Sequence, residues 1–465
     1  MVRPPLRALL AAAALTWGLC LHGAHAQSTA VDAVQAATPA AASATPAAAA
    51  PAAPASHPNS RFRITPVDDT WRANLPRNAE AATQAYLDRL PADVVARSNA
   101  YFEGRYGLQL VEFVLGLAIA ALMLGRRRAA RVRDWAQRVA RHAWPRDALF
   151  GAVYALAGWV LTLPLTIYQG FVREHAYGMA TQGFAAWGAE QLVAMVVTVL
   201  MTAIAVAVFY AVLRATGERW WLWGTVSSVA LLAALVMAGP VFIDPLFNTY
   251  KAVEEGPIKQ RILAMAHANG VPVDNVYEFD ASRQTTRVSA NVSGLGSTAA
   301  VRLNDNLLRR ATPPEVHAVM GHEIGHYALN HVLKMMMQFG LIILFGFLFC
   351  QWAMARLFSR YGPRWGLQRV DDVASLPLLA AVLSVYMLAC TPLINTVIRT
   401  QEVEADLHGL NLAREPHGFA EAILKLTEYR KPDPGALEEW VYFTHPSARN
   451  RILAAMRWRE AMGTP

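Results

Sequence analysis

Cysteine and charge are both scarce in this chain. Only three of its 465 residues are cysteines, Cys20, Cys350 and Cys390, and each lies in an apolar stretch without a partner at metal-ligand spacing. This scarcity excludes a disulfide framework and a cysteine metal site. Charged residues make up only 16% of the chain and hydrophobic residues 54%, a balance typical of an integral membrane protein.

The positive charge is concentrated in one place. Lysine and arginine outnumber aspartate and glutamate by 42 to 34, a formal net charge of +8. Eight arginines fall between Arg126 and Arg146, beside an apolar segment. Such a cluster is typical of a loop that sets membrane topology, and it argues against a nucleic-acid footprint. We therefore expect no nucleic-acid partner.

Long apolar runs supply the main structural prediction. Six of them reach about the 20 residues that a helix needs to cross a bilayer. We predict a mainly α fold, a polytopic cage of transmembrane helices surrounded by membrane lipid. A transporter fits less well, because it would carry ionisable residues inside the spans and these carry almost none. The runs are 108–125, 148–170, 191–213, 220–243, 333–355 and 374–397.

The loops between these runs alternate in charge. The basic loops are 126–147, 214–219 and 356–369. Because basic loops stay on the cytoplasmic side, the alternation places segments 244–332 and 399–465 on the outer side. We predict a multi-pass protein of a bacterial inner membrane whose large polar segments face the periplasm.

The first 60 residues are typical of a targeting segment followed by a spacer. Arg3 and Arg7, a short apolar core and the sequence Ala24-His25-Ala26 indicate a signal peptide over residues 1–26, with an uncleaved anchor as the alternative. Residues 27–60 are mostly Ala, Pro, Ser and Thr, so we expect a disordered tether. Residues 61–107 are amphipathic and predict a small helical cap outside the membrane.

The rest of the chain divides by composition. Four transmembrane helices are expected in 108–243 and two in 333–398. Residues 244–332 predict a soluble α+β insert, and 399–465 predict a C-terminal helical part that joins it. The elements expected within the insert are a helix at 258–269 and strands at 276–279, 288–291 and 299–303.

The most informative stretch is Pro313–His331. Thr312 is a fair N-cap and two prolines suit a first helical turn, so a helix is predicted to begin there. His322 and His326 stand four residues apart and project from one face, close enough to share a metal ion. Glu323 beside them is placed to take a proton from a water, and this H-E-x-x-H pattern is typical of zinc peptidases.

Other residues of this helix have more ordinary interpretations. Gly321 and Gly325 weaken a helix by roughly 1 kcal/mol each, which suggests a packing or site role. Helix geometry turns His331 about 140° away from His326. We therefore interpret His331 as a polar residue near the membrane end of the helix.

A tetrahedral zinc site needs a third protein ligand, and the stretch Arg399–His408 offers one. Glu402 and Asp406 stand four residues apart on one helical face, whereas Glu404 points about 200° away from Glu402. We predict that Glu402 coordinates the metal and that Asp406 accepts the second N–H of a ligating histidine. An acidic, solvated helix end is the competing interpretation.

Together these motifs resemble a known family. Over about Val95–Met456, and in the same order, the chain is similar to the integral-membrane zinc metalloendopeptidases of the type I CaaX prenyl protease family. The blocks that carry the resemblance are S-A-N-V-S-G-L-G (Ser289–Gly296), R-L-N-D-N-L-L (Arg302–Leu308), H-E-I-G-H, R-T-Q-E-V-E-A-D and H-P-S-A-R-N-R (His445–Arg451).

The resemblance implies a helical cage around a large intramembrane chamber, with a small gluzincin-like α+β zinc-metallopeptidase domain and one Zn²⁺ at the chamber wall. Asn291 would hold the substrate backbone on an edge strand. His445 and Arg451 would stabilise the tetrahedral oxyanion and orient the glutamate ligand. The implied zinc ligands are His322, His326 and Glu402, and the implied base is Glu323.

Two departures from the family bear on the substrate. Val292 and Ser293 replace part of the usual pattern after the asparagine, and an outward-facing site would not meet prenylated cytosolic proteins. We predict a membrane-embedded zinc metalloendopeptidase that hydrolyses extended, membrane-associated or misfolded polypeptides. The alternative is a non-catalytic membrane scaffold or quality-control partner with a vestigial zinc site.

Overall fold

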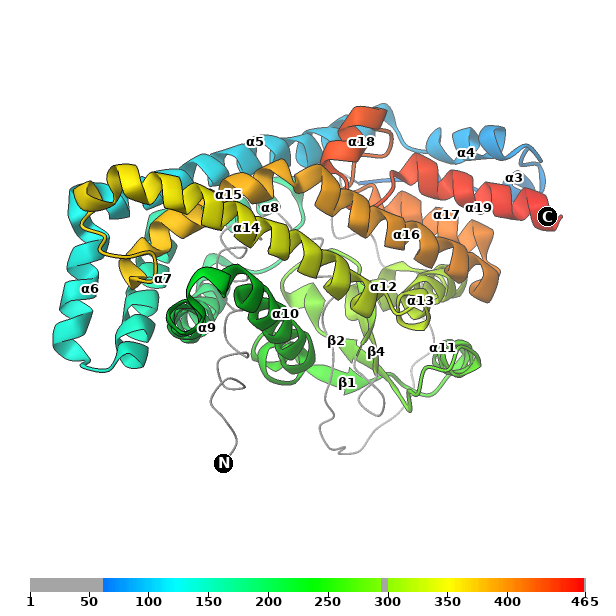
Figure 1. Ribbon diagram of the computed structural model, residues 1–465. Coiled ribbons are helices and arrows are strands. Elements are labelled where there is room, and N and C mark those ends of the chain that lie inside the picture. The colour runs from blue at the N-terminus through cyan, green and yellow to red at the C-terminus, as the bar shows by residue number, and fades with distance from the viewer. Residues whose placement is uncertain (1–61, 294–299, 464–465) are drawn as a thin grey trace.

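The structure is a computed structural model, and it describes residues 62–293 and 300–463. The expected signal peptide (1–26) and tether (27–60) lie outside the described residues. The described chain is mostly helical and contains a four-stranded sheet, in agreement with the mainly α fold predicted from the apolar runs (Figure 1).

Two short helices, α3 (Asp69–Ala73) and α4 (Ala79–Leu87), open the described chain. The side chains of Asp68 and Asn78 accept hydrogen bonds from the first turns of these helices and so cap them. Tyr86 of α4 is fully buried among apolar residues of the C-terminal helices, which lie beside α4 in Figure 1. The N-terminal and C-terminal segments, expected as separate parts, therefore share one core.

The third helix, α5 (Ala92–Leu124), crosses the boundary that was predicted between the helical cap, ending at residue 107, and the first membrane span, beginning at residue 108. It runs without a break from the polar end of the molecule into the apolar segment. Its N-terminal third carries buried Tyr101 and Phe102, and its C-terminal part exposes Leu110 and Val114. A side chain exposed in this way on an apolar helix is suited to lipid contact.

The long apolar helices form the body of the molecule (Figure 1). Their interior faces meet in a core that includes Phe150, Phe209, Phe347 and Met354, while large side chains such as Phe345 remain exposed on the outside. The short, arginine-rich helix α6 (Arg128–Val139) follows α5, and the other helices of this body are α7 (Ala143–Ile167), α9 (Phe184–Thr216), α10 (Trp220–Ala238), α14 (His331–Trp365), α15 (Leu376–Ala389) and α16 (Thr391–Ala413).

The number of membrane-spanning stretches differs from the six predicted. Four described stretches are long and apolar enough to cross a bilayer, or five if the bent pair 373–389 and 391–413 counts as one span. The predicted span 191–213 and most of the predicted span 220–243 fall within the single stretch Phe184–Ala238. A short turn at Gly217, whose φ is +53°, separates α9 from α10 inside that stretch.

A small sheet carries the polar insert. Its order is β1-β2-β4-β3, with β2 and β4 parallel and the outer pairs antiparallel. β2 has the predicted bounds, β3 begins two residues later than predicted, and β1 was not predicted. The strands are β1 (Tyr250–Ala252), β2 (Val276–Phe279), β3 (Ala290–Ser293) and β4 (Ala300–Asn304).

Helices pack on this sheet and complete the polar end. Ile262 of α11, Val301 of β4 and Ile324 of α13 are fully buried in one cluster, so the sheet directly supports the helix that carries the H-E-x-x-H motif. The remaining helices are α8 (Glu174–Tyr177), α11 (Pro257–Ala268), α12 (Asp305–Arg310), α13 (Pro313–Ala328), α17 (Pro416–Leu426), α18 (Ala436–Tyr442) and α19 (Ala448–Met462).

The molecule has two distinct ends, which α14 connects. This helix has 35 residues, about 52 Å at about 1.5 Å per residue, longer than the roughly 30 Å hydrocarbon core of a bilayer. It begins next to α13 and ends near α6 (Figure 1). The motif helices therefore lie at one end, and the arginine-rich α6 lies at the other.

Candidate active site

The motif helix α13 forms as its sequence predicts. Two prolines occupy its first turn, and the Thr312 backbone N–H donates to Glu315 Oε2 at 2.9 Å, which caps the helix. His322 and His326 project from one face, and their Nε2 atoms lie 3.1 Å apart. Local sequence alone therefore brings the first two predicted ligands together.

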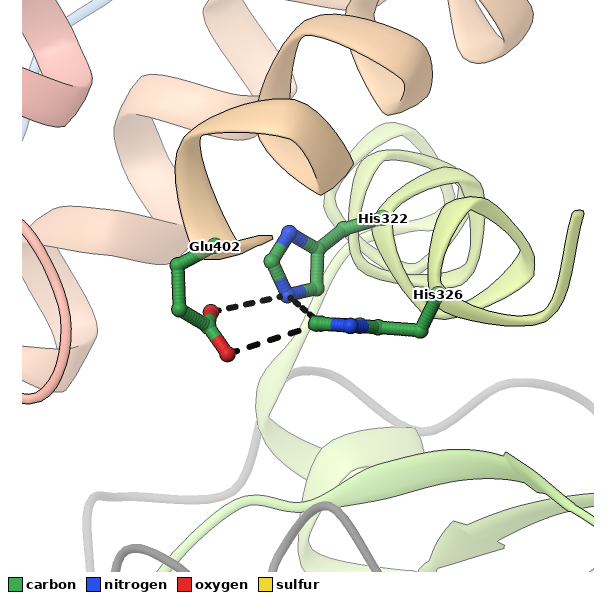
Figure 2. Close-up of side chains that lie close together, drawn as sticks. All are labelled: His322, His326 and Glu402. Carbon is green, nitrogen blue, oxygen red and sulfur yellow. Dashed lines mark hydrogen bonds and ion pairs between the residues drawn. The ribbon is translucent and has the colours of Figure 1, made fainter. Parts of the chain in front are cut away.

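The third predicted ligand comes from α16. Glu402 Oε2 lies 3.3 Å from His322 Nε2, and Glu402 Oε1 lies 3.5 Å from His326 Nε2. Figure 2 shows the Glu402 carboxylate facing both rings. One ligand atom from each of the three residues lies within 4.8 Å of the others. Glu402 and His322 are both buried, so this is not the solvated helix end considered above.

Close contact between α13 and α16 depends on glycine. A Cβ on Gly409 would stand 2.6 Å from the His322 backbone nitrogen, and a Cβ on Gly321 would stand 2.9 Å from the Gly409 carbonyl oxygen. Gly325 faces Ala405 with similarly little room. The two motif glycines thus have the packing role that their helix-weakening presence suggested, and Gly409 is their counterpart on α16.

Asp406 lies behind His322, on the side away from Glu402. Its Oδ1 is 2.8 Å from His322 Nδ1, and Arg451 Nε donates to its Oδ2 at 2.8 Å. All three side chains are buried. A carboxylate there favours the Nδ1–H tautomer, which leaves the His322 Nε2 lone pair directed toward Glu402 and His326. The structure thus places Asp406 where the sequence predicted it.

His331 is the residue that sequence reasoning misplaced. Its Nδ1 lies 2.8 Å from His326 Nδ1, and its Nε2 lies 3.1 Å from Glu404 Oε2. The prediction assumed one continuous helix, but Asn330 adopts a left-handed φ of +54° and starts a new helix. His331 is therefore fully buried against the site rather than facing the membrane end.

The contacts of His331 determine a tautomer for His326. Glu404 accepts from His331 Nε2–H, so His331 Nδ1 is left to accept from His326 Nδ1–H. This arrangement leaves the His326 Nε2 lone pair free. Lys334 also donates to Glu404, at 2.7 Å. Each predicted histidine ligand thus has a hydrogen-bonded partner on Nδ1 and presents Nε2 to the same point.

The pKa values of His322 and His326 shift in opposite directions, because carboxylates dominate at His322 and burial dominates at His326. Burial lowers the pKa of His322, but its hydrogen bond to Asp406 and its contact with Glu402 outweigh burial and raise that pKa to about 10. Burial dominates for His326 and lowers its pKa to about 3. A divalent cation competes with the proton on His322, so its uptake would release that proton.

The donor set fits a divalent cation. Two imidazole nitrogens and one carboxylate match the His₂Glu ligand set of catalytic zinc sites that keep a fourth position open. His322 and Glu402 are buried, and His326 is partly buried. Glu402 Oε2 accepts no hydrogen bond among the described residues, although it is inaccessible to solvent. A buried anionic oxygen without a donor is what a bound cation would satisfy.

His445 and Arg451, two residues implied by the resemblance, approach the site from the C-terminal segment. His445 Nε2 lies 3.2 Å from Glu402 Oε2, on the ligand itself. Burial holds the pKa of the His445 imidazole well below its usual value, so it is neutral. Arg451 is directed at Asp406 instead, so its geometry suits orientation of the Asp406–His322 pair.

Glu323 and Asn291 lie on the elements that border the site. Glu323 follows His322 on α13 and is half-buried. Asn291 is on β3, an outer strand of the described sheet, opposite Arg302 of β4. Ala290 and Val292 pack in the core beneath α13, so strand alternation turns Asn291 to the other face.

A large cavity extends from the site between the membrane helices. Its volume is about 270 Å³, and it is lined by residues that include parts of α5, α7, α9, α15 and α16. His445 and Arg451 contribute to its wall, next to apolar side chains such as Ile119, Leu383 and Met387. The resemblance implied a chamber between the membrane helices, and His445 in the wall of this cavity contacts the candidate ligand Glu402.

Comparisons with known proteins give consistent results. Residues 252–459 match the model of peptidase family M48, and residues 73–249 match the model described as the CAAX prenyl protease N-terminal region with five membrane helices. An uncharacterized metalloprotease of Bacillus subtilis, YhfN, is 29% identical over 333 residues, 71% of this chain and 78% of the relative.

Two eukaryotic proteins extend the comparison. CAAX prenyl protease 1 of Saccharomyces cerevisiae is 25% identical over 320 residues, 63% of this chain and 68% of the relative. The crystal structure of S. mikatae Ste24p superposes with a TM-score of 0.67 at 17% identity, covering 98% of this chain and 100% of that one. At this level of identity the superposition supports the fold.

Proposed function

Because the chain belongs to peptidase family M48, as a membrane metalloprotease of the CaaX prenyl protease type, we propose that it uses one zinc ion held by His322, His326 and Glu402. The observation that carries this proposal is the convergence of three ligand atoms within 4.8 Å. The tautomers of both histidines support it, since each leaves Nε2 free for the ion.

We assign the proton transfers to Glu323. Bound zinc polarises the scissile carbonyl and lowers the pKa of water at its open position toward about 7. Glu323 takes a proton from the attacking water as the new C–O bond forms, and then delivers it to the amine nitrogen as the C–N bond breaks. His445 is neutral and contacts Glu402, so we assign it to orienting the ligand carboxylate and to stabilising the developing oxyanion.

Extended polypeptides at the membrane are the substrates that this site suits. An outer strand such as β3 can pair with an extended chain through main-chain hydrogen bonds, with Asn291 supplying a side-chain contact. The cavity between the apolar helices gives membrane-associated or misfolded segments a route to the site. We propose such polypeptides rather than prenylated cytosolic proteins, because the charge of the loops turns the site outward.

The orientation is proposed from charge and length. The arginine-rich α6 and the candidate site lie at opposite ends of α14, which is longer than a bilayer core is thick. Positive loops on the cytoplasmic side of a bacterial inner membrane then place the site on the periplasmic side. Alkaline phosphatase fused to the C-terminus should be active; activity of a cytoplasmic reporter there instead would overturn this topology.

Cleavage of a casein-like substrate by the purified protein tests the enzymatic proposal. We expect proteolysis that a chelator abolishes and that added zinc restores. A scaffold with a vestigial site would cleave nothing under any of these conditions, and proteolysis that persists after complete removal of metal would contradict the mechanism.

A further inference from the structure

A second cavity lies at the end of the molecule opposite the active site. It is open to solvent and lies between the C-terminal part of α5, the end of α14 and the middle of α15. We call it the basic pocket. Its lining residues are Leu117, Ala120, Ala121, Leu124, Gly125, Arg126, Arg127, Arg364, Trp365 and Ala381.

The basic pocket has an apolar wall and a cationic mouth. Leu117, Ala120, Ala121 and Leu124 follow the i, i+3, i+4, i+7 spacing, so they form one stripe along α5. The stripe is about 10 Å long at about 1.5 Å per residue, and it ends where the arginines begin. An amphiphile with an anionic head and an apolar tail fits this order.

The cationic mouth has no counter-charge among the residues that the structure describes. Of these residues, Arg126, Arg127 and Arg364 line the pocket, and no carboxylate does. Arg127 donates to the main-chain carbonyls of Pro363 and Arg364, at 3.1 and 3.4 Å. The guanidinium groups of Arg126 and Arg364 make no hydrogen bond or ion pair with any other described residue, and both side chains are exposed.

The acidic residues nearby are engaged by other arginines. Arg133 pairs with Asp134 at 2.8 Å and also with Asp372. Asp371 pairs with Arg369 at 2.9 Å. These carboxylates already have arginine partners, and none of the described ion pairs includes Arg126 or Arg364.

The backbone of the pocket is strained at the arginine pair. Arg126 and Arg127 have φ values of +50° and +55°, in the left-handed region that residues with a Cβ rarely adopt. This turn ends α5 and starts α6, and it brings Arg126 and Arg127 to the end of α14. Backbone outliers of this kind persist where the surroundings hold them, often at ligand sites.

We propose that the basic pocket binds an anionic phospholipid of the cytoplasmic leaflet. The phosphate would lie between Arg126 and Arg364, and one acyl chain would lie along the stripe from Leu124 toward Leu117. Trp365 suits the headgroup depth, where tryptophan is enriched. Basic pockets between membrane helices on the cytoplasmic side are suited to anionic headgroups.

Native mass spectrometry of the full-length protein in neutral detergent tests this proposal. The protein is titrated with phosphatidylglycerol and with phosphatidylcholine of the same acyl chains. We expect phosphatidylglycerol to bind about tenfold more tightly or better, and the double variant R126Q/R364Q to lose that preference. The matched control R138Q/R141Q removes the same charge from exposed arginines of α6 and its following loop, and should keep the preference.

A steric variant separates the site from general charge attraction. Ala121→Trp leaves every charge in place and fills the apolar wall from an exposed position. It should reduce phosphatidylglycerol binding about as much as R126Q/R364Q does. Casein cleavage should be unchanged in all of these variants, which shows that they fold.

Several outcomes would overturn the proposal. They are equal binding of the two lipids by the wild-type protein, equal losses in R126Q/R364Q and R138Q/R141Q, and no effect of Ala121→Trp. Displacement of the lipid by inorganic phosphate at matched headgroup concentration would also overturn it, since that result would assign the pocket to free phosphate rather than to a lipid.

Discussion

The two ends of this molecule use charge in opposite ways. At the active-site end, buried charges are paired: Asp406 with Arg451 and His322, and Glu421 with Arg89. At the basic end, the arginines of the pocket are exposed and lack acidic partners among the described residues. Pairing at the first end directs imidazole lone pairs to one point, where we propose a metal, whereas the unpaired charge at the second end is the basis of the proposed orientation and lipid site.

This contrast predicts that the two ends respond differently to substitution. Removal of one buried group at the active-site end leaves its partner unsatisfied and disturbs the metal site. Neutralising an exposed arginine at the basic end should change lipid binding and topology, with little effect on hydrolysis.

The largest effect is expected for Glu323→Gln. This variant removes only the proposed base, so zinc content should stay at the wild-type value while turnover falls about 10²- to 10⁴-fold. Metal analysis and casein cleavage measure the two quantities on the same sample. Glu254→Gln, at an exposed position of the insert, should cleave normally. A normal rate in Glu323→Gln would mean that another group carries the proton.

Gly409→Ala should disrupt the site by separating its two helices. The added Cβ would stand 2.6 Å from the His322 backbone nitrogen, so α13 and α16 must move apart. We expect a loss of about 1–3 kcal/mol in stability, measured by thermal unfolding, together with reduced zinc content. Gly188→Ala, where a Cβ meets nothing within 4 Å, is the matched helical control; it should keep its zinc and gain up to about 1 kcal/mol, because alanine favours a helix over glycine. Equal behaviour of the two variants would show that close helix contact is dispensable.

Asp406→Asn should weaken zinc binding about 10- to 100-fold, because the carboxylate that orients His322 is lost. Competition with a chelator of known affinity gives the value. The control is Asp433→Asn, which changes an exposed carboxylate that pairs with Arg449 at 2.8 Å. Its zinc affinity should equal that of the wild-type protein. Unchanged affinity in Asp406→Asn would remove the assigned role of Asp406.

Glu404→Gln should have a smaller effect of the same kind, below about tenfold in zinc affinity. The side chain of Glu404 is 43% exposed, against 3% for Asp406, and it acts on His326 only through His331. The same chelator competition ranks the two variants. A larger loss of zinc affinity in Glu404→Gln than in Asp406→Asn would contradict the greater importance assigned to Asp406.

The smallest effect concerns acid stability at the active-site end. Burial and the nearby Arg261 lower the pKa of His317 on α13 below its unfolded value of about 6.5. Above about pH 6.5, His317 is neutral in both the folded and the unfolded protein, so it causes no loss of stability there. As the pH falls below about 6.5, the unfolded protein binds a proton at His317 more readily than the folded protein, so stability is lost. Thermal unfolding at several pH values should show a weaker acid loss in His317→Gln than in wild type. The exposed basic-end variant His142→Gln should match wild type; a curve for His317→Gln that also matches wild type would contradict the assignment.

Local patterns predicted the parts of the site that lie within one element. The spacing of His322 and His326 determines a shared face on any helix, and the strand at 276–279 has the bounds that its composition indicated. Glu402 could be predicted because two imidazoles leave a metal short of a ligand. The histidine pair and the strand were predicted from residues close together in the chain, whereas Glu402 was predicted from the chemistry of the metal site.

Features that depend on a single backbone angle or on distant packing could not be predicted. Asn330 breaks the helix with one left-handed residue, and this break moves His331 onto His326. The short strand β1 becomes visible only through its pairing with β2. The basic pocket joins Leu117 and Arg126 to Arg364, more than two hundred residues later. No local pattern in the sequence predicts that residues so far apart in the chain line one pocket.

Zinc-edge X-ray absorption of the purified, zinc-loaded protein tests the central claim most directly. We expect a first shell of nitrogen and oxygen at about 2.0–2.2 Å with no sulfur, and a change in that shell when Glu402 is replaced by alanine. A sulfur ligand, or a spectrum that Glu402→Ala leaves unchanged, would contradict a zinc ion held by His322, His326 and Glu402.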